Sequence, residues 1–107
     1  MSSLPLTPRL LARLRAMFPG PDQAEAIALL EADAGRGLPF GEKLAESEVE
    51  RIRAALLKLS GGTLPGLRKA IAVARVDWRD TLVGAGFGHD PRAHGPWLDE
   101  GQDASAM

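Results

Sequence analysis

The sequence predicts an all-α domain, a small bundle of four main helices followed by a short C-terminal helical turn. Apolar residues recur in four segments with the 3.6-residue period of an amphipathic helix. No segment combines the apolar–polar alternation of a half-buried strand with β-branched or aromatic enrichment, and no Asn-Gly or Asp-Gly hairpin turn occurs. Proline and glycine lie at the starts and ends of the helical segments, as helix boundaries require.

The helices are expected at residues of about 8–18, 22–34, 47–60 and 64–84. Thr7 caps the first, and Pro8 takes its first position, where a missing N–H costs nothing. The second begins near Asp22, whose charge suits a helix N-terminus. Ser47 caps the third, with Glu50 three residues on as in a capping box, and Thr63 caps the fourth. Gly61 and Gly62 end the third helix, where a glycine is available for the left-handed cap.

The fourth expected helix carries the strongest periodic signal. Its apolar face is a spine of five residues, Leu67, Ile71, Ala74, Trp78 and Leu82. We expect one helix, bent at most, although Asp77 could instead cap a new short helix. In the third helix Leu57 lies off the main apolar face, which suits a central helix contacted from two sides. A last helical turn is expected between Asp90 and Leu98.

Length and composition fit one domain. The chain has 107 residues, and we expect a single domain over residues 1–98 and a disordered acidic tail over residues 99–107. The absence of cysteine excludes disulfides, thiolate zinc sites, iron–sulfur clusters and cysteine nucleophiles. No secretory signal is visible, and no apolar run approaches the roughly 20 residues of a membrane span. We therefore expect a cytoplasmic protein.

Charge is unevenly distributed although the net charge is only −1. Residues 21–50 carry eight acidic and two basic residues, whereas residues 51–79 carry seven basic residues and one acidic residue. The simplest interpretation is that acidic helices pack near basic ones. The alternative is that the basic block, Arg51–Arg79, is an anion-binding surface.

No catalytic or metal constellation emerges, so we expect neither an enzyme nor a cofactor. His89 and His94 are the only histidines, and we expect both to be exposed; a loop metal site including Asp90 is the alternative. We interpret the run Asp77–Asp80 as structural. Trp78 would point inward while Asp77 and Asp80, with Arg75 and Arg79, would form a buried latch between neighbouring helices.

The function that the sequence favours is a non-enzymatic module that binds another protein or itself. Four apolar residues lie off the main core stripe, and together they would form a partner surface: Leu57, Val73, Val76 and Val83. Basic residues flank them on the fourth helix, so the candidate interaction surface comprises Arg68, Arg75, Arg79, Leu57, Val73 and Val76.

The alternative function is nucleic-acid binding through the basic block, with Trp97 as the one exposed aromatic residue that could stack on a base. The helix-turn-helix-like connection around Ser60–Thr63 fits this alternative. The start of the fourth helix, Leu64–Leu67, argues against it because it offers no side chain that reads bases.

Between Arg51 and Gly88 the sequence resembles a group of short bacterial helical proteins with the pattern LKLSGG…LR…DWRD…GF. The matching residues are Arg51, Arg53, Leu57, Lys58, Leu59, Ser60, Gly62, Leu64, Leu67, Arg68, Asp77, Trp78, Arg79, Asp80, Leu82 and Phe87. The resemblance implies a small helical bacterial protein, and it brings no activity, substrate or catalytic residue.

Overall fold

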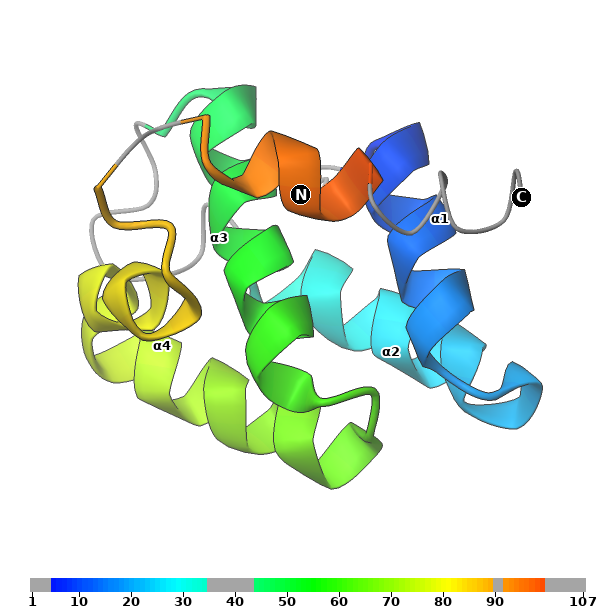
Figure 1. Ribbon diagram of the computed structural model, residues 1–107. Helices are drawn as coiled ribbons and strands as arrows, with labels where there is room; N and C mark the ends of the chain where they lie inside the picture. Colours follow the sequence, from blue (N-terminus) through cyan, green and yellow to red (C-terminus); the bar gives the residue numbers. More distant parts are fainter. Residues whose placement is uncertain (1–4, 35–43, 90–91, 100–107) are drawn as a thin grey trace.

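The computed structural model describes residues 5–34, 44–89 and 92–99. Within these ranges the chain is all-α and contains no strand (Figure 1). The elements are α1 (Pro8–Met17), α2 (Gly20–Asp33), α3 (Glu46–Ser60) and α4 (Leu64–Ala85), followed by a short helix over residues 94–99. The predicted bundle of four main helices with a C-terminal helical turn is confirmed. Of the expected tail, only Asp99 lies within the described residues, and it belongs to the short helix.

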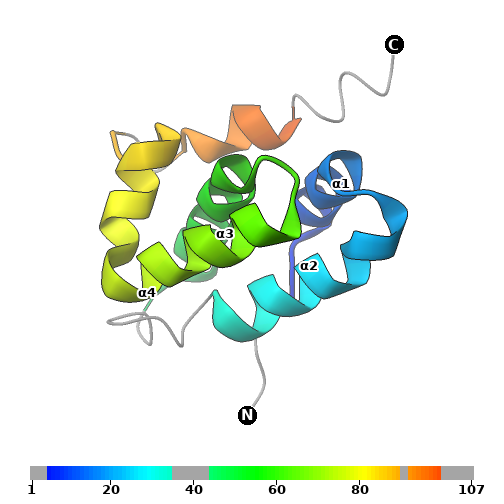
Figure 2. The ribbon, with the colours of Figure 1, turned by 90° about the horizontal axis from the view of Figure 1, so that it is seen from below.

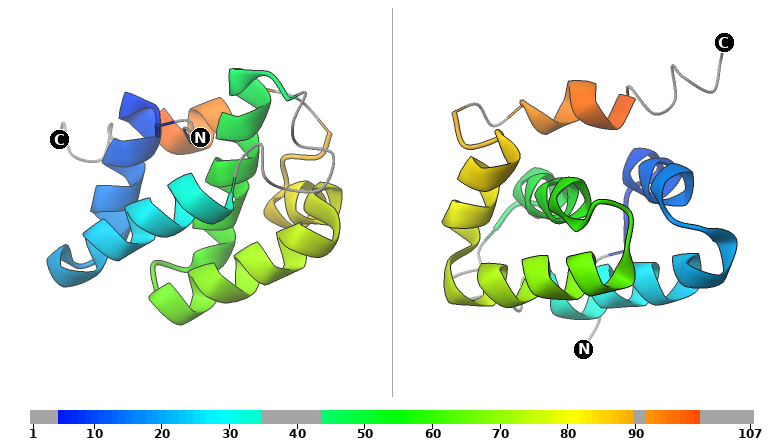
Figure 3. Two further views of the ribbon diagram at one scale, coloured as in Figure 1. Left: turned by 180° about the vertical axis from the view of Figure 1, so that it is seen from behind. Right: turned by 60° about the horizontal axis from the view of Figure 1, so that its bottom comes forward.

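α3 is the central element of the bundle. Seen nearly end on in Figure 2, it has the first part of α4 below it, residues 78–89 beside it and residues 92–99 above it. The right panel of Figure 3 shows α1 and α2 completing the enclosure on the other side. Every residue of α3 from Val49 to Leu57 is buried as a result. The central position predicted for this helix is therefore confirmed.

The caps of α1 and α4 are as predicted, but that of α3 is not. The Thr7 hydroxyl accepts the N–H of Leu10, and the Thr63 hydroxyl accepts the N–H of Gly66. α3 instead begins at Glu46 after Ala45, without a side-chain cap. The predicted capping box is wrong because the Glu50 carboxylate bonds to charged and polar groups of other segments, which stabilise it more than a backbone N–H would.

α4 is sharply kinked at Asp77, so the expectation of one helix, bent at most, is wrong, and the alternative, in which Asp77 caps a new helix, is right. Asp77 has extended backbone angles (φ −158°, ψ 103°) inside the helix. Its Oδ1 accepts the N–H of Arg79 at 3.0 Å, as an N-cap does. After the kink the chain returns toward α3, where Leu82 and Ala85 are buried (Figure 2).

One contiguous core fills the space between the helices. The spine predicted for α4 contributes Leu67, Ile71, Ala74 and Leu82 to it. Trp78, expected to point inward, is only partly buried against this core because it lies next to the kink. None of the described helices combines the length and the apolar character needed to cross a bilayer.

Candidate functional site

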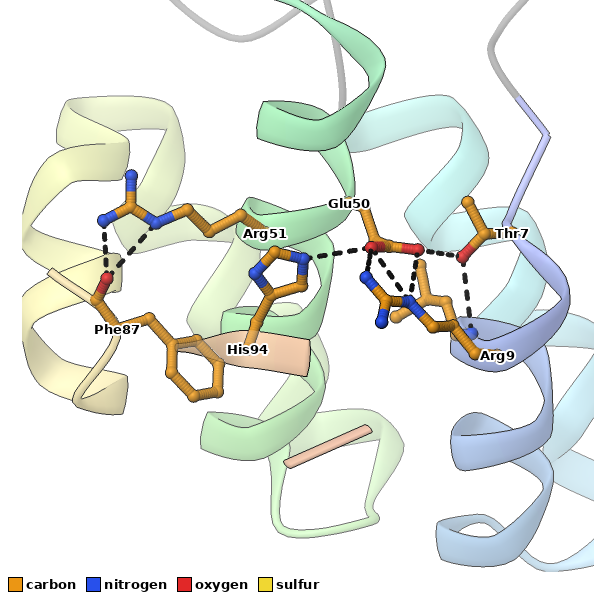
Figure 4. Close-up of polar contacts among 7 residues, drawn as sticks. Thr7, Arg9, Glu50, Arg51, Phe87 and His94 are labelled. Carbon is orange, nitrogen blue, oxygen red and sulfur yellow. Dashed lines mark hydrogen bonds and ion pairs between the residues drawn. The ribbon is translucent and has the colours of Figure 1, made fainter. Parts of the chain in front are cut away.

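A buried carboxylate joins the start of α1, the first half of α3 and the short C-terminal helix. Glu50 of α3 is only 7% exposed. Arg9 donates to it from Nη2 at 2.5 Å and from Nε at 3.2 Å, and the Thr7 hydroxyl donates to its Oε2. His94 Nε2 lies 3.0 Å from Oε1 (Figure 4). We call Thr7, Arg9, Glu50 and His94 the Glu50 cluster.

The cluster keeps Glu50 ionised. Burial raises the pKa of the Glu50 carboxyl, but the hydrogen bonds from Arg9, Thr7 and His94 outweigh burial and lower that pKa from 4.5 to about 2. An ionised carboxylate only accepts hydrogen bonds, so Nε2 of His94 carries the proton in this pair. The other ring nitrogen, Nδ1, is buried and has no hydrogen-bond partner among the described residues.

A carboxylate that orients an imidazole is the arrangement of many general bases. In such a pair the second ring nitrogen must reach the substrate. Nδ1 of His94 is buried and points away from Glu50 (Figure 4). The hydrogen bonds of the cluster join three segments of the chain.

The two histidines do not form a metal site within the described residues. His94, expected to be exposed, is buried and pairs with Glu50, whereas His89 is exposed as expected. No three potential ligands among histidines and carboxylates come together in the part of the chain that the structure describes. Asp90, the third member of the alternative site, lies outside the described residues.

An open depression of about 440 Å³ lies against the Glu50 cluster. It is lined by Arg9, Ser47, Glu50, Arg92, His94 and Gly95. Arg9 pairs with the Glu50 carboxylate in this depression, and the Asp99 carboxylate acts on Arg9 as well. The positive charge of Arg9 is therefore balanced within the chain.

The sequence analysis missed the Glu50 cluster although a signal for it exists. Glu50, Arg53 and Leu57 are spaced three and four residues apart, so they lie on one side of α3. Leu57 already indicated a second buried side of this helix. A glutamate on that side must find partners, and Thr7 and Arg9 at the neighbouring helix start supply them.

Much of the basic block is used inside the molecule. Arg51 donates to the Phe87 carbonyl from Nε at 3.2 Å and from Nη2 at 2.5 Å (Figure 4). Lys58 donates to the Ala85 carbonyl at 2.9 Å. Both bonds fix the segment after the kink onto α3. These two cations of the Arg51–Arg79 block therefore serve the fold.

Arg53 is buried as well. It donates to the Ala34 carbonyl at 2.6 Å and to the Pro5 carbonyl at 3.3 Å, while its Nη2 has no partner in the part of the chain that the structure describes. Burial lowers the pKa of its guanidinium, and the charge of Glu31 acts in the opposite direction. The block is thus interrupted at its start and is not one continuous anion-binding surface.

Trp97 is not the free aromatic residue that the nucleic-acid interpretation requires. It is half-buried, the Arg13 guanidinium lies 4.4 Å from its ring centroid, and the Phe87 ring lies at 6.0 Å. One face of the indole is therefore covered by a cation.

The predicted latch between helices at Asp77 is also wrong. The Asp77 carboxylate pairs with Arg79 of the same segment, at 3.0 Å from Nε, and the guanidinium is largely exposed. The hydrogen bonds from the Arg79 side chain and backbone lower the pKa of Asp77. Arg75 forms no ion pair within the described residues, so these charges shape the kink and do not join neighbouring helices.

The structure divides the predicted apolar patch. Leu57 is fully buried in the core, because α3 is contacted from both sides. Val76 is 83% exposed and Val73 is 49% exposed on the first part of α4. Val83 lies beyond the kink and is exposed separately, and Leu59 of α3 is partly exposed. The patch is therefore reduced to the two valines before the kink.

These valines lie in a surface that we call the α4 outer face. It consists of the exposed residues of α4 between Leu67 and Asp77: Arg68, Lys69, Ala72, Val73, Arg75 and Val76. No acidic residue occurs between Leu64 and Val76. Glu25 of α2 pairs with Arg68 at this face.

The fold and its sites define a small all-α bundle with a buried ionic cluster and with an outer helix face that is both basic and apolar. Comparison of the chain with protein-family models, with curated proteins and with solved structures gives no match.

Proposed function

We propose that this chain is a non-enzymatic module that binds a partner protein through the α4 outer face. The observation that carries the proposal is the exposure of Val76 (83%) and Val73 (49%) among three basic side chains on a helix segment without an acid. Apolar side chains in the middle of a contact exclude water, and charges at its rim select and steer the partner. The partner surface that fits is apolar and rimmed by carboxylates.

The enclosed histidine supports the non-enzymatic part of the proposal. The most reactive arrangement in the described residues is the pair of Glu50 and His94, and the ring nitrogen that would act as a base is buried. The other ionised groups named above are in ion pairs, bond to carbonyls or lie on the open surface.

The partner is a different protein and not a second copy. A symmetric dimer places the same patch of both subunits face to face. On the α4 outer face this would set Arg68, Lys69 and Arg75 against the same three cations, which repel each other.

A photo-crosslinking amino acid tests the proposal in the cells from which the protein comes. Placed at Val76 of the full chain, it should give an adduct with one protein, and placed at the exposed Ala12 of α1 it should not. The captured protein, once purified, should bind the purified chain with an affinity that Val76→Asp lowers about tenfold, equivalent to about 1.4 kcal/mol.

Three results would contradict the proposal. They are equal adducts from positions 76 and 12, an adduct with nucleic acid or with a second copy of the chain, and binding of the purified partner that Val76→Asp leaves unchanged. A titration with short DNA and RNA at low salt checks the nucleic-acid outcome directly, because phosphate contacts weaken steeply as salt is added.

A further inference from the structure

A shallow groove that shares Arg68, Ala72 and Arg75 with the α4 outer face has a pattern of charges that specifies its occupant. The groove has a volume of about 240 Å³ and lies between α2 and α4. Its apolar residues are Leu29, Ile71 and Ala72, and its basic residues are Arg68 and Arg75. We call it the α2–α4 groove.

The two arginines are seven residues apart on one helix. Seven residues make about two helical turns and span roughly 10 Å. Both guanidinium groups therefore lie on the same flank of α4, with Ile71 and Ala72 between them along the helix axis. The groove thus presents a cation, an apolar floor and a second cation in a row.

We infer that the α2–α4 groove binds an amphipathic helix of the partner that carries two acidic residues seven positions apart with apolar residues midway between them. This inference rests on the proposed function and names the chemistry of the partner. In such a helix the two acidic residues are also two turns apart, which matches the spacing of Arg68 and Arg75. Both carboxylates therefore meet the guanidinium groups when the apolar residues between them face the apolar floor of the groove. Arginine is suited to such contacts because it binds carboxylates through two parallel N–H groups.

The chain cannot supply this helix itself. Its sequence contains no two acidic residues that are seven positions apart. A second copy therefore has no segment that matches both arginines at once, which agrees with a partner of different sequence.

Glu25 competes with the partner for one of the two arginines. It pairs with Arg68 across the edge of the groove, and both side chains are about half exposed. Exposed ion pairs of this kind are weak, so a partner carboxylate can displace Glu25. Arg75 forms no ion pair within the described residues and is open to the second carboxylate.

A fluorescently labelled helical peptide, stapled to keep it helical, tests the inference by anisotropy with the full chain. The peptide has an alanine-rich sequence, two glutamates seven positions apart and leucines at the third and fourth positions after the first glutamate. The control peptide has the same composition with the glutamates five positions apart, which places them on different sides of the helix.

The first peptide should bind measurably more tightly than the control. Arg75→Gln and Arg68→Gln should each weaken its binding about tenfold, equivalent to about 1.4 kcal/mol. Glu25→Gln should strengthen it severalfold because Arg68 is then free of its internal partner. Arg15→Gln, on the exposed side of α1, should change nothing.

Equal binding of the two peptides, no binding, or a Glu25→Gln variant that binds like the unaltered chain would each overturn the inference. A protein adduct from position 76 with a negative peptide result would leave the proposed function standing and remove only this account of the partner.

Discussion

Glu50 shows how one residue can determine the arrangement of three segments. Its carboxylate accepts hydrogen bonds from Thr7 and Arg9 at the start of α1 and from His94 in the last helix. Burial of an unpaired carboxylate would cost several kcal/mol. Here the donors compensate for the lost water, so the charge is retained and the segments are held in register.

Replacing Glu50 by glutamine should destabilise the fold by about 2 kcal/mol at neutral pH, because bonds to a charged acceptor are lost. The unaltered chain should also lose stability in acid. The pKa of Glu50 is about 2 in the folded state and about 4.5 without its partners, so its contribution is complete above pH 4.5 and disappears toward pH 2. Urea unfolding at several pH values measures both effects.

The matched control is Glu48→Gln. Glu48 lies one half-turn away and forms a 3.6 Å ion pair with Arg51, with about a third of its side chain exposed. Its loss should cost less than about 1 kcal/mol. A Glu50→Gln variant that is as stable as Glu48→Gln, or that keeps the full acid dependence, would show that the cluster does not carry this energy.

At the scale of elements, the turn between α3 and α4 depends on close backbone approach. Gly61 and Gly62 have positive φ, of 65° and 80°. Gly66, in the first turn of α4, has ordinary helical geometry, but a Cβ there would lie 2.2 Å from the Ser60 carbonyl oxygen and 2.8 Å from Thr63 Oγ1. Both atoms belong to the turn that caps α4, so neither can move cheaply.

Gly66→Ala should therefore destabilise the protein by about 2 kcal/mol through this overlap, although alanine is the better helix former. Gly84→Ala, in the same helix, is the matched control. A Cβ at Gly84 meets only Leu59 methyl groups at 3.9 Å. This variant should gain about 0.5–1 kcal/mol. Thermal or urea unfolding distinguishes them, and a stabilised Gly66→Ala would show that the turn adapts.

The elements themselves were predictable because their signals are local. The Thr7 and Thr63 caps and the glycines after α3 each act within a few residues, and the structure confirms all of them. The kink at Asp77 was visible as an alternative only. Whether the helix continues or breaks at Asp77 depends on where the following segment can bury Leu82, which is a property of the whole fold.

At the scale of the whole molecule, the enclosure of α3 explains what the sequence could not show. Periodicity marks a buried face but does not say whether a second face is covered. Arg51 and Arg53 look like surface cations in the sequence, yet the structure buries both against backbone carbonyls. The number of basic residues in the block could therefore be read from the sequence. Which of them are exposed on the α4 outer face depends on how the other elements pack and could not be read from it.

This enclosure gives the last prediction, which concerns Leu57. Leu57 is fully buried, whereas Leu59, two residues on, is 42% exposed. Leu57→Ala should lower the free energy of unfolding by about 3 kcal/mol, since a cavity opens in a core shared by all helices. Leu59→Ala should cost less than about 1 kcal/mol. Both should unfold in one cooperative urea transition. Equal losses for the two variants, or a Leu57→Ala variant that unfolds in two steps, would contradict a single core built around α3.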